Sequence, residues 1–283
     1  MIRYYADPEP GFDKILQKIL QELGVPFLEK LAAALSDLGK DERARVIDIA
    51  RRQDMRVMLN TLARTAGTTP DALRAVTEAA LEWLLGFRLL KRHRELLGDI
   101  FFRLDTVESK TGALRDIVYC GAELEILQGI ILLLDELEKA DYSTSKVEVV
   151  RFLSAIRALI DALPKYLFMM AAITPTSRDR FFAMLPAFAG RLQNILELPP
   201  LLNANEAVEL ANFYVKNARE EALRKGKKGR PGSREILAEE ELREKFSESF
   251  RRAGQRGDKG VRQRDFLNAL RELTAERLRG GSV

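Results

Sequence analysis

Four short segments interrupt an otherwise helical sequence, and they constrain the fold more than any other feature. They are Ile2–Ala6, Gly129–Leu134, Leu167–Ile173 and Asn194–Leu198. Continuous apolar runs are typical of strands buried on both faces of a parallel sheet, although periodicity alone also fits a buried helix. The sequence therefore predicts an α/β fold with a parallel sheet, in which Gly129–Leu134 lies next to both Ile2–Ala6 and Leu167–Ile173.

The stretches between these segments carry the apolar spacing of amphipathic helices. The largest, at about residues 26–127, is predicted to be a helical insert that is large enough to bind a partner. A loop at residues 224–234 contains six positive charges together with glycine and proline. This loop could touch nucleic-acid phosphates, but it has no aromatic residues for base stacking, so a solvated linker is favoured. The predicted division is an α/β core at residues 1–200 and a helical region at residues 201–283.

The composition excludes several classes of site. Lys and Arg number 46 and Asp and Glu 42, so the net charge is 46 − 42 = +4, which is small for a dedicated nucleic-acid binder. Cys120 is the only cysteine and His93 the only histidine. This excludes an internal disulfide framework, a cysteine-based zinc site and a two-histidine metal site. We expect His93 to be solvated in a basic turn, and Trp83 to lie in the core.

The sequence gives no sign of a membrane protein. The first residues lack the layout of a signal peptide. The nearly uncharged stretch Leu163–Pro175 is too short to span a bilayer as a helix, and Lys165 interrupts it. We therefore expect a cytoplasmic protein without a membrane partner.

The most informative segment is Gly129–Lys139, with the sequence GIILLLDELEK. An apolar strand that ends in Asp-Glu has a specific use in P-loop ATPases, because ligands collect at the carboxyl ends of strands in open α/β sheets. The first carboxylate, Asp135, would hold Mg²⁺, and the second, Glu136, would orient and deprotonate the attacking water. The alternative is a buried strand followed by acidic residues at a helix N-terminus, where the helix dipole favours them.

The segments that follow occur in the order found in ATPases of the AAA+ type. Leu167–Ile173 ends in Thr174, at the position where such ATPases keep a sensor of the γ-phosphate. Arg191 precedes Asn194–Leu198, which resembles the place where those ATPases present an arginine. Alone, Thr174 is equally a turn residue, and Arg191 is more simply a solvated charge at a helix end.

Further motifs make the resemblance more specific. They are Trp83–Gly86, LLLDELEK, IRALIDAL at Ile156–Leu163, AGRLQNILEL and Arg264–Leu267. With these motifs the chain resembles the P-loop ATP-binding family that includes the ATP-binding proteins of bacteriophage-exclusion (BREX) gene clusters. LLLDELEK is the strongest of them, and the resemblance covers most of the chain.

The resemblance implies a nucleotide-dependent switch with ATP and Mg²⁺ as cofactors, protein partners or self-association, and a role in phage defence. Asp135 would bind the metal, and Arg264, at the start of the closing helix, would reach the nucleotide as a second sensor. A surface arginine is an equally good explanation of Arg264. Residues 201–283, including the helix Asn205–Leu223, would form a helical lid. The implied catalytic residues are Asp135, Glu136, Thr174 and Arg191.

One departure from the family is large. These families open with a phosphate loop, G-x-x-x-x-G-K-[ST], between the first strand and the first helix, and this sequence has none. Ile2–Ala6 resembles the second strand of the family. The fold expected is therefore an incomplete P-loop NTPase sheet with a large helical insert. Either the amino-terminal strand and loop are truncated, which the intact acidic pair favours, or the chain is a degenerate member whose partner supplies them.

The missing loop has two expected consequences. Nucleotide binding should be weak or absent, because the loop's N–H groups and lysine supply most of the grip on the phosphates. The sheet should also have an unfilled slot between Leu167–Ile173 and Asn194–Leu198, where the missing strand would lie, and therefore an unpaired and exposed edge. The favoured function is an AAA+-type ATPase-like switch, and the alternative is a non-catalytic scaffold that binds protein or nucleic acid. Whether this chain is an enzyme stays open.

Overall fold

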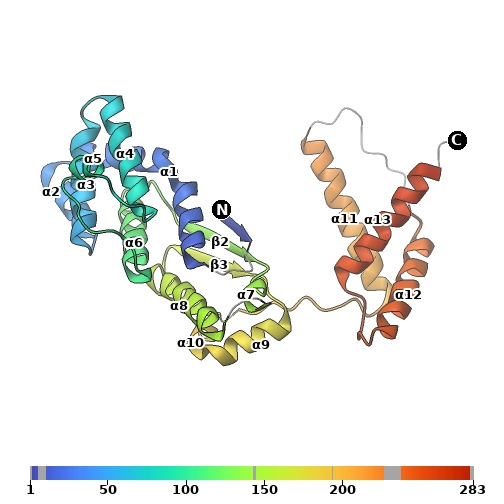
Figure 1. The fold of residues 1–283 in the computed structure, drawn as a ribbon. Coiled ribbons are helices and arrows are strands. Elements are labelled where there is room, and N and C mark those ends of the chain that lie inside the picture. The colour runs from blue at the N-terminus through green and yellow to red at the C-terminus, as the bar shows by residue number, and fades with distance from the viewer. Residues whose placement is uncertain (1, 6–10, 143–144, 193, 226–236, 281–283) are drawn as a thin grey trace. The chain divides into compact units, whose positions relative to one another are not determined.

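The structure is a computed structural model that describes residues 2–5, 11–142, 145–192, 194–225 and 237–280 (Figure 1). The described elements, in chain order, are β1 (Ile2–Tyr5), α1 (Phe12–Asp37), α2 (Lys40–Asp48), α3 (Gln53–Ala66), α4 (Pro70–Leu84), α5 (Lys91–Leu96), α6 (Val107–Glu123), β2 (Ile130–Asp135), α7 (Lys139–Tyr142), α8 (Lys146–Ala162), β3 (Leu167–Ala171), α9 (Pro175–Met184), α10 (Pro186–Ala189), α11 (Ala204–Arg224), α12 (Glu239–Gln255) and α13 (Gln263–Gly280).

The chain divides into two compact units, Met1–Asn194 and Ile195–Val283. Each unit has a hydrophobic core of its own. The first contains all three strands and the helices α1 to α10, and the second contains α11, α12 and α13. The sequence-based division was placed after residue 200.

The three described strands form a parallel sheet in the order β1-β2-β3. Leu132 of β2 pairs with Ile2 of β1 on one side and with Met169 of β3 on the other. The predicted position of Gly129–Leu134 between its two neighbours is therefore confirmed. The coarse class, a mostly helical α/β chain with a small parallel sheet, agrees with the sequence-based expectation.

Helices cover one face of this sheet. The connection from β1 to β2 and the connection from β2 to β3 both step the same way across the sheet. Right-handed crossovers that step the same way place their helices on the same face. In agreement, α1 packs against β1, α6 and α8, and α6 packs against α8 (Figure 1). The side chains of β2 that point into this layer are fully buried: Ile130, Leu132 and Leu134.

The opposite face of the sheet is open among the described residues of this unit, and here the expectation of strands buried on both faces is wrong. Ile131 on β2 is 46% exposed, and its register partner Phe168 on β3 is 59% exposed. Met170, two residues further along the same face, is 52% exposed. The strands are apolar on both faces, but the crossover direction places α1, α6 and α8 on only one of them.

The predicted strand Asn194–Leu198 does not form, which corrects the sequence analysis. These residues have no regular secondary structure, and Leu196 and Leu198 are 87% and 84% exposed. A strand needs a neighbour for its backbone N–H and C=O groups. No described strand lies beyond β3, so the outer edge of β3 is unpaired in the described part of the chain. The predicted slot between Leu167–Ile173 and Asn194–Leu198 is not observed, because the second segment is not a strand.

The predicted insert at residues 26–127 is helical, but it shares its core with the sheet. Its first helix is the second half of α1, which runs on from the helix before the insert. The two halves of α1 meet at Gly24, whose φ of 65° and ψ of −177° are not helical. Gly24 thus forms a kink directly before Pro26, as its left-handed φ allows. Helices α3 and α4 pack on α1, and their buried side chains belong to the same cluster as those of β2.

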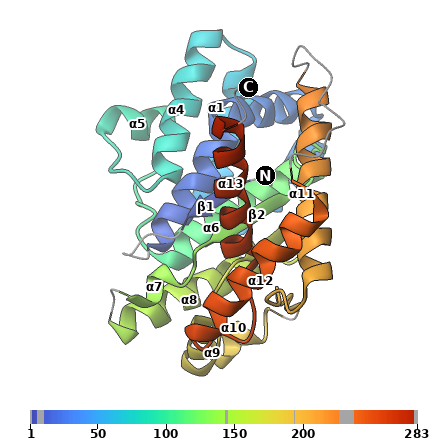
Figure 2. The same ribbon diagram turned by 90° about the vertical axis from the view of Figure 1, so that its right-hand side faces the viewer.

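Two single residues in this region have different outcomes. Trp83 is fully buried, as predicted, and its indole Nε1 donates a hydrogen bond of 2.9 Å to the carbonyl of Phe102. The expectation of a solvated His93 is wrong, because its side chain is only 12% exposed and its Nδ1 lies 3.0 Å from a carboxylate oxygen of Glu82. Helix α5, which carries His93, packs against α4, which carries Glu82 (Figure 2).

The second unit is a small three-helix assembly. Its core includes Phe246 of α12 and Phe266 of α13, whose rings meet edge to face at 6.1 Å. Arg277 of α13 donates to the carboxylate of Glu241 on α12 at 2.6 Å. The predicted basic loop, residues 224–234, lies outside the described residues apart from its first two. No helix in the described ranges combines the length and the apolar character that a membrane span requires.

Candidate functional site at the carboxyl edge of the sheet

Strands β2 and β3 end side by side, and their ends are tied together by backbone hydrogen bonds. Leu134 pairs with Ala171 in the parallel register. The N–H of Ala172 donates to the carbonyl of Leu134 at 2.8 Å, and the N–H of Leu137 donates to the carbonyl of Ala172 at 3.2 Å. The segments that follow the two strands are therefore held in one fixed arrangement at the carboxyl edge of the sheet, where ligands bind in open α/β sheets.

Asp135 is the last residue of β2, and its side chain is partly buried. Alternation along the strand puts it on the same face as Ile131, which is the open face. Its Oδ1 accepts a hydrogen bond of 3.0 Å from the N–H of Glu136. The carboxylate thus lies where the open face meets the carboxyl edge.

Glu136 has a left-handed backbone, with a φ of 56°, which few residues other than glycine adopt. Such conformations cost about 1–3 kcal/mol and cluster at functional sites. Its Oε2 lies 2.5 Å from the Nζ of Lys139, and both side chains are about two-fifths exposed. The predicted water-orienting carboxylate is therefore engaged in a local ion pair.

Thr174 follows β3 and immediately precedes α9. It occupies the N-cap position in an extended conformation, with Pro175 as the first helical residue. Its side chain makes no capping hydrogen bond, although threonine at an N-cap often does. The residue is exposed, so the hydroxyl is available to a ligand at the same edge as Asp135.

Arg191 lies at the other edge of the sheet. Its Nε and Nη2 donate to the two carboxylate oxygens of Asp161 at 2.7 and 3.3 Å. This hydrogen bond and the charge of Asp161 raise the pKa of Arg191. Asp161 is in the last turn of α8, and β3 begins directly afterwards, at its amino end. The structure therefore does not bring Arg191 together with Asp135 within one chain.

Arg264 belongs to the second unit. It is the second residue of α13 and is exposed. Its expected contact with a nucleotide stays a prediction, as do the catalytic roles of the other candidates.

The oxygen donors at the carboxyl edge suit one half of a magnesium–nucleotide complex. Mg²⁺ prefers one or two carboxylates together with water and phosphate oxygens, rather than a cage made of protein side chains. The described residues contain no group of three or more His, Cys, Asp or Glu side chains that could hold a metal. Asp135 and the hydroxyl of Thr174 have the oxygen chemistry that Mg²⁺ and a phosphate would require, and the sequence contains no phosphate loop.

The comparisons with known proteins identify no relative: no protein-family model, no curated protein and no solved structure matches the chain. The resemblance to the AAA+-type family therefore rests on the sequence motifs quoted above. The topology of the sheet is compatible with it.

Two partners of the candidate residues escaped the sequence analysis. Lys139 is three residues after Glu136, a spacing that often pairs charges on a helical turn, so the motif did contain this signal. Asp161 is thirty residues from Arg191. Nothing in the sequence indicates that second pair, because it depends on how α8 packs against α10.

Proposed function

We propose that this chain is an ATPase-like protein of the AAA+ type, a cytoplasmic nucleotide-dependent switch that acts in phage defence with protein partners or with further copies of itself. The supporting observation is that Asp135 and Thr174 follow two adjacent parallel strands and lie at the same edge of the sheet. That edge is the general ligand-binding position of open α/β sheets.

In this proposal the side chains at the carboxyl edge have distinct tasks. Asp135 would hold Mg²⁺, which when bound neutralises charge on the β- and γ-phosphates. The hydroxyl of Thr174 would donate to a γ-phosphate oxygen. Glu136 would accept a proton from the attacking water, and to do so its carboxylate must leave Lys139, which now lies 2.5 Å away.

The proposal requires an element that grips the phosphates. The open face of the sheet and the unpaired edge of β3 give such an element a place to bind, because both expose apolar or hydrogen-bonding groups that parallel sheets normally bury. A strand followed by a phosphate loop and a helix would cover both features at once. Arg191, at the opposite edge, would serve a neighbouring copy rather than its own site.

The alternative is a non-catalytic scaffold that binds protein or nucleic acid. The ion pair between Glu136 and Lys139 favours it, because the carboxylate is already engaged by a side chain of the same turn. In that case Asp135 and Glu136 only mark the end of β2 and have no catalytic role. The helices of the first unit would then bind the partner.

The deciding experiment compares two proteins, the 283-residue chain and a fusion in which a strand and a G-x-x-x-x-G-K-[ST] loop precede Met1. We expect negligible phosphate release from the chain alone. It has a carboxylate that could bind the metal, but it lacks the phosphate loop and the lysine that would stabilise charge on the phosphates. We expect the fusion to bind and hydrolyse ATP. Binding is measured with a fluorescent ATP analogue, and turnover by phosphate release.

Substitutions in the fusion separate the two functions. Glu136→Gln should retain ATP and block turnover, and Asp135→Ala should remove the Mg²⁺ dependence of binding. Glu138→Gln, in the same motif, is the matched control and should leave both unchanged. A fusion that folds but does not bind ATP would favour the scaffold. Robust hydrolysis by the 283-residue chain, abolished by Asp135→Ala, would show that other residues hold the phosphates.

A further inference from the structure

The connection between α5 and α6 exposes two adjacent aromatic side chains. Phe101 is 68% exposed and Phe102 is 75% exposed. Isolated apolar side chains on a surface need no explanation, but two neighbouring phenyl rings beside a hollow are typical of binding surfaces. The nucleotide proposal makes no use of this segment.

The backbone of this connection is fixed, so the exposed rings do not belong to a loose loop. Leu97, Ile100 and Leu104 are buried in the core of the first unit. The carbonyl of Phe102 accepts the hydrogen bond from the indole of Trp83 at 2.9 Å. A second hydrogen bond holds the next residue, because Nε of Arg103 donates to the carbonyl of Gly86 at 2.6 Å. A surface held in this way loses little conformational freedom when it binds.

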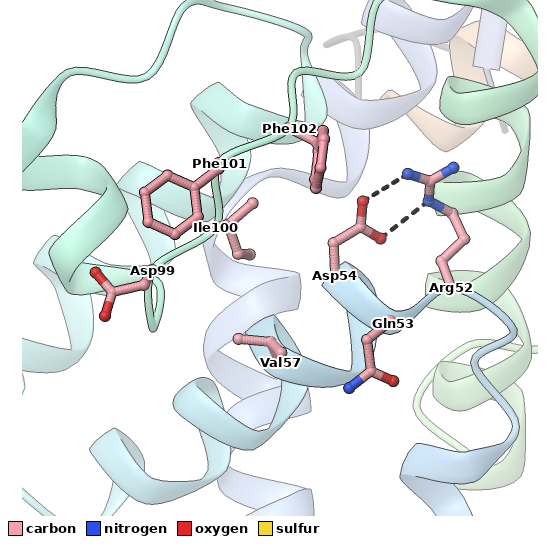
Figure 3. Close-up of a pocket in the computed structure, with 8 residues that line it drawn as sticks. All are labelled: Arg52, Gln53, Asp54, Val57, Asp99, Ile100, Phe101 and Phe102. Carbon is pink, nitrogen blue, oxygen red and sulfur yellow. Dashed lines mark hydrogen bonds and ion pairs between the residues drawn. The ribbon is translucent and has the colours of Figure 1, made fainter.

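A left-handed turn orients the start of the connection. Gly98 and Asp99 have φ angles of 78° and 63°. A Cβ on Gly98 would lie 2.9 Å from Oγ1 of Thr61, so a larger residue cannot replace this glycine without a shift. Aspartate tolerates the left-handed region better than most residues but still at some cost. The strained turn places Asp99 next to Phe101 at the rim of the pocket, with its carboxylate directed outwards (Figure 3).

These residues line a pocket with a volume of about 440 Å³ (Figure 3). Ile100 and the two rings form one side of it, and Val57 and Asp54 at the start of α3 lie opposite (Figure 3). This volume is within the range of protein pockets that bind ligands.

The charges in the pocket favour a cation. Asp54 is neutralised by Arg52, whose Nε and Nη2 donate to its two oxygens at 3.0 and 2.5 Å. The carboxylate of Asp99 has no such partner among the described residues. Arg94 lies over the ring of Phe101, 6.0 Å from its centroid, and is not part of the pocket lining. The lining therefore carries one uncompensated negative charge on a chain whose net charge is +4.

We propose that this pocket binds a protein segment that presents an arginine flanked by apolar side chains. The guanidinium would pair with Asp99 and stack on a phenyl ring, and its apolar neighbours would contact Phe102, Ile100 and Val57. Single-stranded nucleic acid also stacks on aromatic rings, but its phosphates would be repelled by Asp99. This site is independent of nucleotide chemistry at the sheet.

The test is a selection from a random peptide phage library against the folded chain. We expect the enriched peptides to share an arginine next to apolar residues. A synthetic peptide of the consensus should bind at least about tenfold more weakly to Asp99→Asn, given the usual strength of charge-assisted hydrogen bonds. It should also bind more weakly to the double variant Phe101→Ser/Phe102→Ser, and replacing its arginine by citrulline should weaken binding similarly.

Phe168→Ser is the control, because Phe168 is also more than half exposed but lies on the sheet, and it should leave binding unchanged. The three variants and the unmodified chain are first compared by circular dichroism and thermal unfolding. Enrichment without arginine, no enrichment at all, or equal binding by Asp99→Asn would each overturn the proposal. A fluorescein-labelled oligo-dT that binds Asp99→Asn more tightly than the unmodified chain, and loses binding with the double serine variant, would assign the pocket to nucleic acid instead.

Discussion

The two faces of the central strand differ sharply although their sequence is almost uniform. On one face of β2, Leu132 is completely buried, and on the other Ile131 is 46% exposed. The neighbouring β3 repeats the contrast, with Phe168 and Met170 more than half exposed on the open face. Both faces are apolar, but only one is covered by α1, α6 and α8.

This contrast shows that the composition of a strand and its cover are separate properties. Parallel strands with helices on both faces are apolar on both faces. Here the crossovers advance in one direction, so they supply helices to only one face. The open face thus has the composition of a strand built for a second layer, which the described residues of the first unit do not provide.

The largest expected effect is a difference in stability between the two faces. Leu132→Ala should lower the free energy of unfolding by about 2–5 kcal/mol, because it leaves a cavity under the helices. Ile131→Ala should cost less than about 1 kcal/mol, since much of its side chain is already in water. Urea unfolding followed by circular dichroism measures both. Equal losses would show that the open face is covered in solution.

Cys120 tests how tightly the covered side excludes water. This thiol lies on α6 in the same core, and burial, with a smaller contribution from Asp116, raises its pKa to about 12. The unfolded thiol has a pKa of about 8.5, so the protonated thiol favours the folded state fully below that pH and progressively less as pH rises towards 12.

Relative to Cys120→Ala, the unmodified chain should therefore lose roughly 1–2 kcal/mol of stability between pH 8 and pH 10. Labelling with a thiol reagent at pH 8 should require unfolding. Rapid labelling of the native chain would contradict a tight covered side. Cys120→Ala removes the titrating group and leaves all other groups in place, so it is the control.

A smaller effect is expected from dye binding to the open face. The chain should enhance the fluorescence of 8-anilinonaphthalene-1-sulfonate, and Phe168→Ser/Met170→Ser should reduce the signal because it removes exposed apolar area. Phe213→Ser, at an exposed position of α11, is the control for apolar surface elsewhere. In the fusion with a strand and phosphate loop, the signal should fall without any substitution.

The smallest effect concerns the pair at the amino edge. Arg191 and Asp161 are both more than two-fifths exposed, so their coupling should be weak and screened by salt. A double-mutant cycle of Arg191→Gln and Asp161→Asn, by thermal unfolding at low salt and in 0.5 M NaCl, measures it. A coupling that persists at high salt would indicate that this edge is more enclosed than the open face.

Much of the sheet could be predicted from the sequence, because strand formation is visible in short apolar runs. The segments around Leu132 and Met169 were both placed correctly, and their parallel order put Asp135 and Thr174 at one edge. Asn194–Leu198 failed because a strand also depends on a neighbour, and no local pattern reports whether one is present. For the same reason the exposure of Phe168 could not be foreseen.

The side-chain chemistry of the site was less predictable. The left-handed backbone of Glu136 and its ion pair with Lys139 both depend on the turn after β2. This turn contains no glycine, so the sequence does not indicate that a residue in it is left-handed. The aromatic pocket was missed because Phe101 and Phe102 lie between helices and fit no periodic pattern. The signal that could have indicated it is the Gly98-Asp99 turn directly before two adjacent aromatic residues.

The two hydrogen bonds that tie Leu134 and Leu137 to Ala172 have a mechanical consequence. They join the residues on either side of Asp135 to Ala172, which lies three residues before α9, so these two segments cannot move separately without breaking backbone hydrogen bonds. Helix α9 has ten residues and is therefore about 15 Å long, and it leads to α10 and Arg191. A displacement of the turn after β2 would thus move α9 as a rigid helix, and α9 would pass this movement on to the segment that carries Arg191.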